Sequence, residues 1–98
     1  MPIKTVNISH ISIDDKYHPR EEINLTTVKE YEEAMRGGDK FPPIVLFKDA
    51  NRFYLADGRH RIEATKALGK SEIEADIRKG DKRTAILFSV NANSRHGI

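Results

Sequence analysis

The 98-residue sequence contains no cysteine, which excludes disulfide bonds, a thiolate nucleophile and every metal site with sulfur ligands. Tryptophan is also absent, and four phenylalanines and three tyrosines leave the core mainly aliphatic. No apolar run approaches the length that crosses a membrane, and the first residues lack the apolar stretch of a secretory signal. We therefore expect a cytoplasmic protein with no membrane partner.

An excess of one charge is lacking as well. Lys and Arg number 17 against 15 Asp and Glu, so the net charge is only +2. This near-balance gives no broad electrostatic footprint for nucleic acid. Any anion binding must depend on local clusters of cations.

The order of hydrophobic and turn patterns predicts a single α+β domain over residues 1–98, with a small mixed β-sheet flanked by helices. The strand patterns are at 3–13 (one strand, or two broken near residues 9–10), 44–47, 53–56 and 71–79. The helix patterns are at 25–36, 59–68 and from Asp81 onward.

Two of these helices carry specific packing expectations. The helix after the Asn24 cap has an apolar stripe that we expect to be buried, composed of Leu25, Val28, Tyr31 or Glu32, and Met35. The helix after Asp81 is apolar nearly all round, which predicts a central place in the core.

Residues 56–69 contain the pattern around which the rest of the chain is organised. Gly58 separates a predicted strand from a predicted helix, and Arg59, His60 and Arg61 occupy the first turn of that helix. Free backbone N–H groups, the helix dipole and cationic side chains together favour a bound phosphate. Arg61 shares a face with Ala64, so we expect Arg61 to be held by packing and Arg59 to swing freely.

A structural alternative exists for the same residues. Arg61 can pair with Asp57 or Glu63, while Arg59 and His60 face water. Asp57 can then serve only as a turn residue that caps the helix.

Polar residues gather in two further places. The loop 14–20 brings Tyr17, His18 and Arg20 together, a combination suited to stacking on a base beside a phosphate. Residues 91–97 place amide, guanidinium and imidazole groups at the end of the last helix. Each stretch can equally be a solvated segment of the chain.

Four pieces in this order resemble the ParB/sulfiredoxin superfamily. They are the Pro19-Arg20 loop, the Pro43-Ile44-Val45 entry to a strand, the Gly58–Ala64 stretch with its Gly-x-His-Arg-x-x-Ala pattern, and the closing residues 91–97. The resemblance spans nearly the whole chain and implies the fold of that superfamily. Its members include nucleotide-binding partition proteins, ATP-using sulfiredoxins and small-molecule kinases. Arg59 stands where sulfiredoxins need a cysteine, so that activity is excluded.

The resemblance implies roles for particular residues. Nucleotide binding would fall on Arg20, Gly58, Arg59, His60, Arg61, Asn93, and Arg95 or His96. Asp57 is similar to an acidic residue of the kinase-like members, where it would hold Mg²⁺ or orient a hydroxyl, and Asn93 would be a second metal ligand. Ala92 replaces a glutamate of the partition proteins, which counts against CTP hydrolysis and against metal binding.

Our leading expectation is a ParB-like domain that binds a nucleoside triphosphate, CTP or ATP, with Mg²⁺ and acts as a switch in a DNA-associated protein. The alternatives are a phosphotransferase or nucleotide hydrolase that uses Asp57, and a DNA-binding or nuclease-like module. Partition proteins carry a helix-turn-helix after this domain, so a longer gene product with such a domain beyond Ile98 would favour the switch, and whether the natural chain continues is left open. A homodimer is among the oligomeric states left open.

Overall fold

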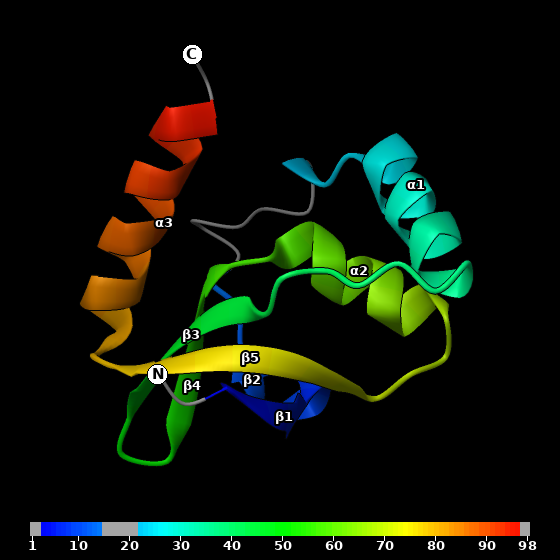
Figure 1. Ribbon diagram of the computed structural model, residues 1–98. Coiled ribbons are helices and arrows are strands. Elements are labelled where there is room, and N and C mark those ends of the chain that lie inside the picture. Colours follow the sequence, from blue (N-terminus) through cyan, green and yellow to red (C-terminus); the bar gives the residue numbers. More distant parts are fainter. Residues whose placement is uncertain (1–2, 15–21, 97–98) are drawn as a thin grey trace.

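One mixed sheet organises the computed structural model, which describes residues 3–14 and 22–96, with side chains described as far as Asn91 (Figure 1). Its strands are β1 (Ile3–Asn7), β2 (Ile11–Ser12), β3 (Ile44–Asp49), β4 (Arg52–Asp57) and β5 (Glu72–Lys79). Their order is β1-β5-β3-β4-β2, with β5–β3 and β4–β2 parallel and the other pairs antiparallel. The predicted α+β class with a mixed sheet is confirmed.

The N-terminal stretch forms two short strands, one of the two alternatives that the sequence left open. The 3-10 turn η1 (Ile8–His10) separates β1 from β2, yet these strands lie at opposite edges of the sheet. A flat five-stranded sheet would hold its outer strands about 19 Å apart. A fully extended chain from Asn7 to Ile11 reaches only about 14 Å. The sheet must therefore curl and present a concave face.

The core lies on both faces of β3, because side chains alternate along a strand. Ile44 and Leu46 join a cluster on the concave face with Leu55 and the fully buried Ile62. Val45 and Phe47 join the cluster on the other face, together with Ala56 and Ala85. The expectation that residues 44–47 form a buried strand is confirmed.

The helices are α1 (Leu25–Arg36), α2 (Arg59–Ala67) and α3 (Lys82–His96). As predicted, the Asn24 side chain caps α1 by accepting a hydrogen bond from the Thr27 N–H at 3.1 Å. The predicted buried stripe on α1 is only half-buried: α1 has no fully buried residue, Leu25 is 77% exposed, and Val28, Tyr31, Glu32 and Met35 are partly shielded. The reason is that α1 packs against α2, outside the sheet, and so reaches neither core cluster (Figure 1).

The last helix is capped as predicted but is not central. Asp81 Oδ1 accepts hydrogen bonds from the Thr84 backbone N–H at 2.9 Å and from its hydroxyl at 2.8 Å. These bonds hold the pKa of the Asp81 carboxyl below its ordinary value. Ala85 faces the sheet, while Leu87 and Val90 are half exposed because α3 covers β3 and β4 with one face only.

Candidate functional site

The turn between β4 and α2 depends on the missing side chain of Gly58. Gly58 has a φ of 122°, a conformation that residues with a side chain rarely adopt. A Cβ added there would lie 2.4 Å from Ile44 Cγ2 and 2.7 Å from Ile44 Cβ. Glycine therefore lets the start of α2 press directly against the buried strand β3.

A β-bulge precedes this turn and positions Asp57. Leu46 pairs with Leu55 and Val45 pairs with Asp57, so Ala56 is an extra residue without a partner on β3. Bulges bend a strand and redirect the side chains that follow. The Asp57 carboxylate consequently reaches α2, where Oδ2 lies 3.2 Å from Arg61 Nη2.

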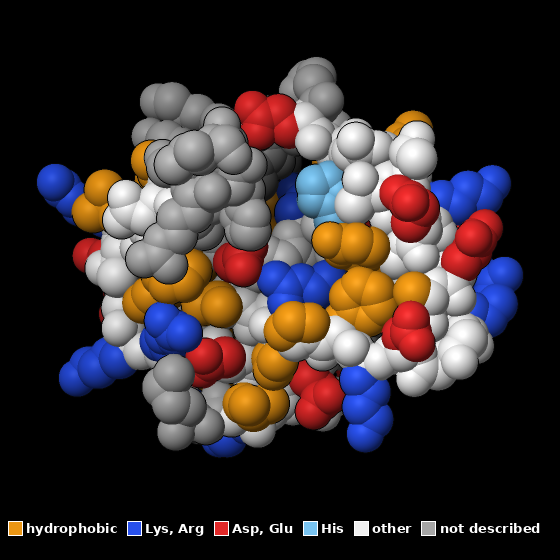
Figure 2. Space-filling view, turned by 45° about the horizontal axis from the view of Figure 1, so that its top comes forward, with side chains coloured by type: hydrophobic (Ala, Val, Ile, Leu, Met, Phe, Trp, Pro, Cys, Tyr) orange, Lys and Arg blue, Asp and Glu red, His pale blue; other side chains and the backbone are white. Residues whose placement is uncertain are grey.

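A pocket of about 440 Å³ opens beside this turn, and we call it the Gly58 pocket. Its lining residues are Tyr31, Phe41, Pro42, Asp57, Gly58, Arg59, His60 and Arg61. Figure 2 shows cationic and histidine side chains in a hollow of this face, with hydrophobic side chains beside them. The rings of Tyr31 and Phe41 contact each other, with centroids 4.9 Å apart. The pocket thus combines a cationic wall with an apolar, aromatic wall.

The N-terminus of α2 has no side-chain cap. Gly58 is the N-cap residue, and the first intrahelical bond runs from the Ile62 N–H to the Gly58 carbonyl at 3.0 Å. The N–H groups of the first turn have no acceptor within the helix, and they carry the positive end of its dipole. The expectation that Asp57 caps α2 is therefore wrong, because its carboxylate pairs with Arg61 instead. This end of α2 can accept an anion.

Both arginines of the turn are held in place. Arg61 donates through Nη1 to the carbonyls of Pro42 at 2.7 Å and Pro43 at 3.0 Å, in addition to its pair with Asp57. Arg59 donates through Nε to Glu63 Oε2 at 3.2 Å. Their side chains are equally shielded, each 14% exposed. The expectation that Arg61 is fixed is confirmed, whereas the freely swinging Arg59 is wrong because Glu63 lies one turn further along α2.

His60 links α2 to α1. Its Nε2 accepts a hydrogen bond from the Asn24 backbone N–H at 2.9 Å. The alternative in which His60 merely faces water is therefore wrong. The bond also ties the N-cap of α1 to the rim of the Gly58 pocket.

Several predicted site residues lie outside the described residues. Arg20 falls in the segment 15–21, and the side chains of Asn93, Arg95 and His96 lie beyond Asn91. Their roles stay predictions. Among the described residues, no group of three His, Cys, Asp or Glu side chains is arranged to hold a metal ion. Among the described residues that line the Gly58 pocket, Asp57 is the one carboxylate. Mg²⁺ commonly takes one or two carboxylates, with phosphates supplying further oxygens.

The sequence patterns do not predict three contacts at or near the pocket. Tyr31 belongs to the predicted buried stripe of α1, no site role is predicted for Phe41, and Glu63 is predicted as a partner of Arg61 and not of Arg59. The i, i+4 spacing of Arg59 and Glu63 was a usable signal, since such pairs face each other on a helix. The meeting of Tyr31 with Phe41 had no such signal, because it depends on how α1 docks.

Comparisons of sequence identify the family of the chain. The family model for the ParB N-terminal domain matches residues 2–94. A probable chromosome-partitioning protein ParB from Campylobacter jejuni is 35% identical over 72 residues. That match covers 74% of this chain but only 26% of the relative, so the chain spans about a quarter of its length. Among the described residues, no helix is long and apolar enough to cross a membrane.

Comparisons of structure show the same fold. Sulfiredoxin from Arabidopsis thaliana is similar with a TM-score of 0.77 and 26% identity, covering 90% of this chain and 97% of that one. A C-terminally truncated ParB from Caulobacter crescentus, complexed with CTP-γ-S, is similar with a TM-score of 0.76 and 14% identity. The match covers 97% of this chain and 54% of that one. A free serine kinase in complex with AMP is similar with a TM-score of 0.61 and 15% identity, and the match covers 76% of this chain and 30% of that one. Fold and family therefore agree.

Proposed function

Because the chain belongs to the family of ParB N-terminal domains, we propose that it binds a nucleoside triphosphate in the Gly58 pocket and acts as a nucleotide-dependent switch in a DNA-associated protein. The Caulobacter ParB of the same fold is complexed with CTP-γ-S, which makes CTP the first nucleotide to test and ATP the second.

The observation that carries this proposal is the uncapped N-terminus of α2, which opens into a pocket with one cationic and one aromatic wall. Phosphate oxygens would accept hydrogen bonds from the free N–H groups of the first turn. The rings of Tyr31 and Phe41 offer an apolar surface to the sugar or the base.

The two arginines have different tasks in this proposal. Arg61 already makes three hydrogen bonds, two of them to the carbonyls of Pro42 and Pro43, and it stays in place as a positioning residue. Arg59 would exchange its carboxylate partner Glu63 for a phosphate oxygen. The exchange frees the Arg59 guanidinium for the phosphate, because Glu63 neutralises Arg59 as Asp57 neutralises Arg61.

Bound Mg²⁺ would neutralise part of the phosphate charge. Asp57 is suited to hold it, since its side chain is 43% exposed at the pocket and only Oδ2 faces Arg61. Asn93 stays the second proposed ligand, from the far end of α3.

Thermal shift with each of the four ribonucleoside triphosphates, with and without Mg²⁺, tests the proposal. A ligand at a hundredfold excess over its Kd stabilises the folded state by about 2.7 kcal/mol. At about 4–8 °C per kcal/mol for a domain of this size, Tm should rise by roughly 10–20 °C. The absence of a shift with every nucleotide would overturn the proposal.

Two arginine variants locate the site. Arg59→Gln should weaken nucleotide binding at least about tenfold, since one charge-assisted bond contributes about 1.5–3 kcal/mol. Arg52→Gln is the matched control, because Arg52 is exposed at the start of β4 and does not line the Gly58 pocket. Titration calorimetry of both measures the difference. Equal affinity in the two variants would place the nucleotide elsewhere.

A second candidate, phosphotransfer, is favoured by the exposed Asp57 carboxylate at the pocket and by the fold shared with a serine kinase. Asp57 would take a proton from an acceptor hydroxyl or hold Mg²⁺. Asp57→Asn keeps an oxygen for Arg61, so nucleotide binding should persist while turnover falls by about a hundredfold. Phosphate release is measured with candidate acceptors such as free serine. Equal rates in wild type and variant remove Asp57 from the catalytic role.

We assign DNA contact to a part of the protein other than this domain. A net charge of +2 can neutralise few phosphates, and the salt-dependent part of DNA binding scales with that number. Gel shifts with this domain at near-physiological salt should give no specific complex. A sharp band with one duplex sequence would favour the DNA-module alternative instead.

A further inference from the structure

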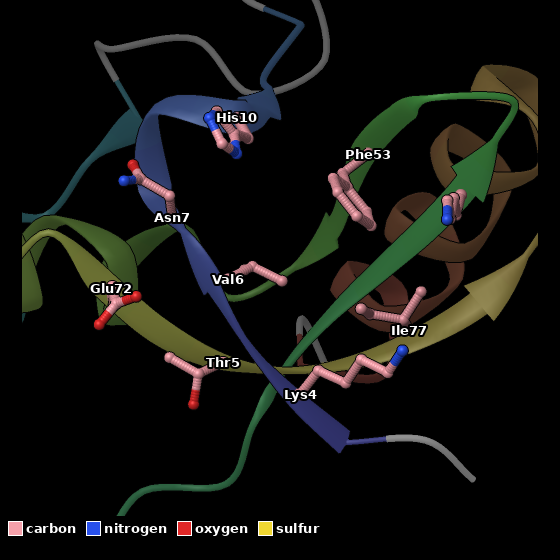
Figure 3. A pocket seen from close by; sticks show the side chains of 9 residues that line it. Lys4, Thr5, Val6, Asn7, His10, Phe53, Glu72 and Ile77 are labelled. Atoms are coloured by element: carbon pink, nitrogen blue, oxygen red, sulfur yellow. The ribbon is translucent and has the colours of Figure 1, made fainter.

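A second pocket, of about 540 Å³, opens on the concave face of the sheet, and we call it the concave-face pocket. It shares no lining residue with the Gly58 pocket. Figure 3 shows it between β1 and the neighbouring strands. Its lining residues are Lys4, Thr5, Val6, Asn7, His10, Lys48, Phe53, Glu72 and Ile77.

The floor of this pocket is apolar. Val6, Phe53 and Ile77 come from three different strands, and their side chains point toward one another in Figure 3. All three belong to or pack against the concave-face core cluster. The floor is therefore a part of the core that α2 leaves uncovered. Its size is typical of pockets for small organic molecules.

Two lysines stand at positions where strand alternation predicts apolar residues. Lys4 is two residues before the buried Val6 on β1, and Lys48 is two residues after the buried Leu46 on β3. Residues two apart share a face of the sheet, so both side chains start from the concave face. Lys48 Nζ lies 5.7 Å from the centroid of the Phe53 ring.

The charges around the pocket favour an anion. Within residues 3–14 and 22–91, neither Lys4 nor Lys48 takes part in an ion pair. His10 adds an exposed imidazole at the rim, and Glu72 contributes the one carboxylate of the lining. In Figure 3, Glu72 and Lys4 lie at opposite ends of β1. The end of the pocket at Lys4 is therefore positively charged.

We propose that the concave-face pocket binds a small organic anion with an aromatic or apolar body. The body would cover Val6, Phe53 and Ile77, and the anionic group would lie between Lys4 and Lys48. A carboxylate and a phosphate monoester share this chemistry, and the experiment separates them. Burial of the apolar body supplies affinity, and the lysines supply the preference for negative charge.

The experiment is a titration of the ¹⁵N-labelled protein followed by amide shifts. The probes are 3-phenylpropionate, 2-phenylethyl phosphate and the neutral 3-phenylpropanamide. Shifts are expected in β1, in the β3–β4 hairpin and near Ile77, with at least one anion binding fivefold or more tightly than the amide. The tighter anion identifies the preferred headgroup.

Lysine variants then test the source of that preference. Lys4→Gln and Lys48→Gln should each weaken anion binding at least threefold and leave binding of the neutral amide unchanged. Lys70→Gln is the matched control, because Lys70 is exposed and lines neither pocket. The same loss in Lys70→Gln would overturn the proposal.

Two other results would also overturn it. Equal affinity for the anions and the amide, or no shift with any probe, would leave Lys4 as an inward-pointing charge that merely protects an edge strand from pairing. Shifts confined to residues 57–61 would place the anion in the Gly58 pocket.

Discussion

Replacing Gly58 by alanine should be among the most damaging single changes in this chain. The substitution forces a side chain into a φ of 122° and against Ile44, whose Cα would lie 3.3 Å from the new Cβ. Backbone strain of this kind costs about 1–3 kcal/mol, and overpacking a core adds about 1–3 kcal/mol. The total, about 2–6 kcal/mol, is a large fraction of the 5–15 kcal/mol that stabilises a typical domain.

Gly38→Ala is the matched control, because Gly38 also has a positive φ, 97°, but no atom lies within 4 Å of its added Cβ. The control keeps the strain and omits the clash. Urea denaturation of both variants should show Gly58→Ala about 1–3 kcal/mol less stable than Gly38→Ala. Stabilities within about 0.5 kcal/mol of each other would refute the close approach of the β4–α2 turn to β3.

Three further predictions concern stability. Arg61→Gln should cost about 1–3 kcal/mol by releasing the carbonyls of Pro42 and Pro43, whereas Arg36→Gln, which removes the 3.7 Å pair of the exposed Arg36 with Glu32, should cost less than about 0.5 kcal/mol in the same urea assay. Ala50→Gly should stabilise the β3–β4 hairpin by about 0.5–1 kcal/mol, since Ala50 has a φ of 54°; an unchanged urea midpoint would contradict this. Asp81→Ala should lower Tm at neutral pH. The folded-state pKa of Asp81 lies below its ordinary value of 3.8. The stabilisation by the Asp81 carboxylate is therefore complete above pH 3.8 and is lost as pH falls through the folded-state pKa. The Tm difference between wild type and Asp81→Ala should shrink in acid. A constant difference across the acid range would rule out this linkage.

Local signals predicted the elements well, because each depends on neighbours in sequence. Asn24 and Asp81 cap the starts of α1 and α3 through their side chains, and Gly38, with a φ of 97°, follows the end of α1. Gly69 follows α2 with a φ of 78°, and the next residue, Lys70, donates its N–H to the Thr65 carbonyl and so closes the end of the helix. The exposure of Leu25 and Leu87 could not be predicted, since it depends on which elements leave one face of a helix uncovered.

The sequence predicted only those parts of the candidate site that depend on residues adjacent in the chain. The Gly58 turn and its cations follow from adjacent residues. The pair of Arg61 with Asp57 was one of the alternatives, but its bonds to Pro42 and Pro43 cross a long sequence separation. The bond from Asn24 to His60 spans 36 positions and depends on the docking of α1 against α2. Such contacts come from tertiary packing, which local patterns do not encode.

The place of β5 in the sheet has a consequence for how the chain folds during its synthesis. β5 lies between β1 and β3, although it follows both in the chain. A nascent chain can form the β3–β4 hairpin and α2 as they leave the ribosome, but β1 waits for its partner until Lys79 has emerged. We expect proteases to cleave the N-terminal strand in stalled chains whose residues 72–79 are still inside the ribosome, and to spare it in chains from which Lys79 has emerged.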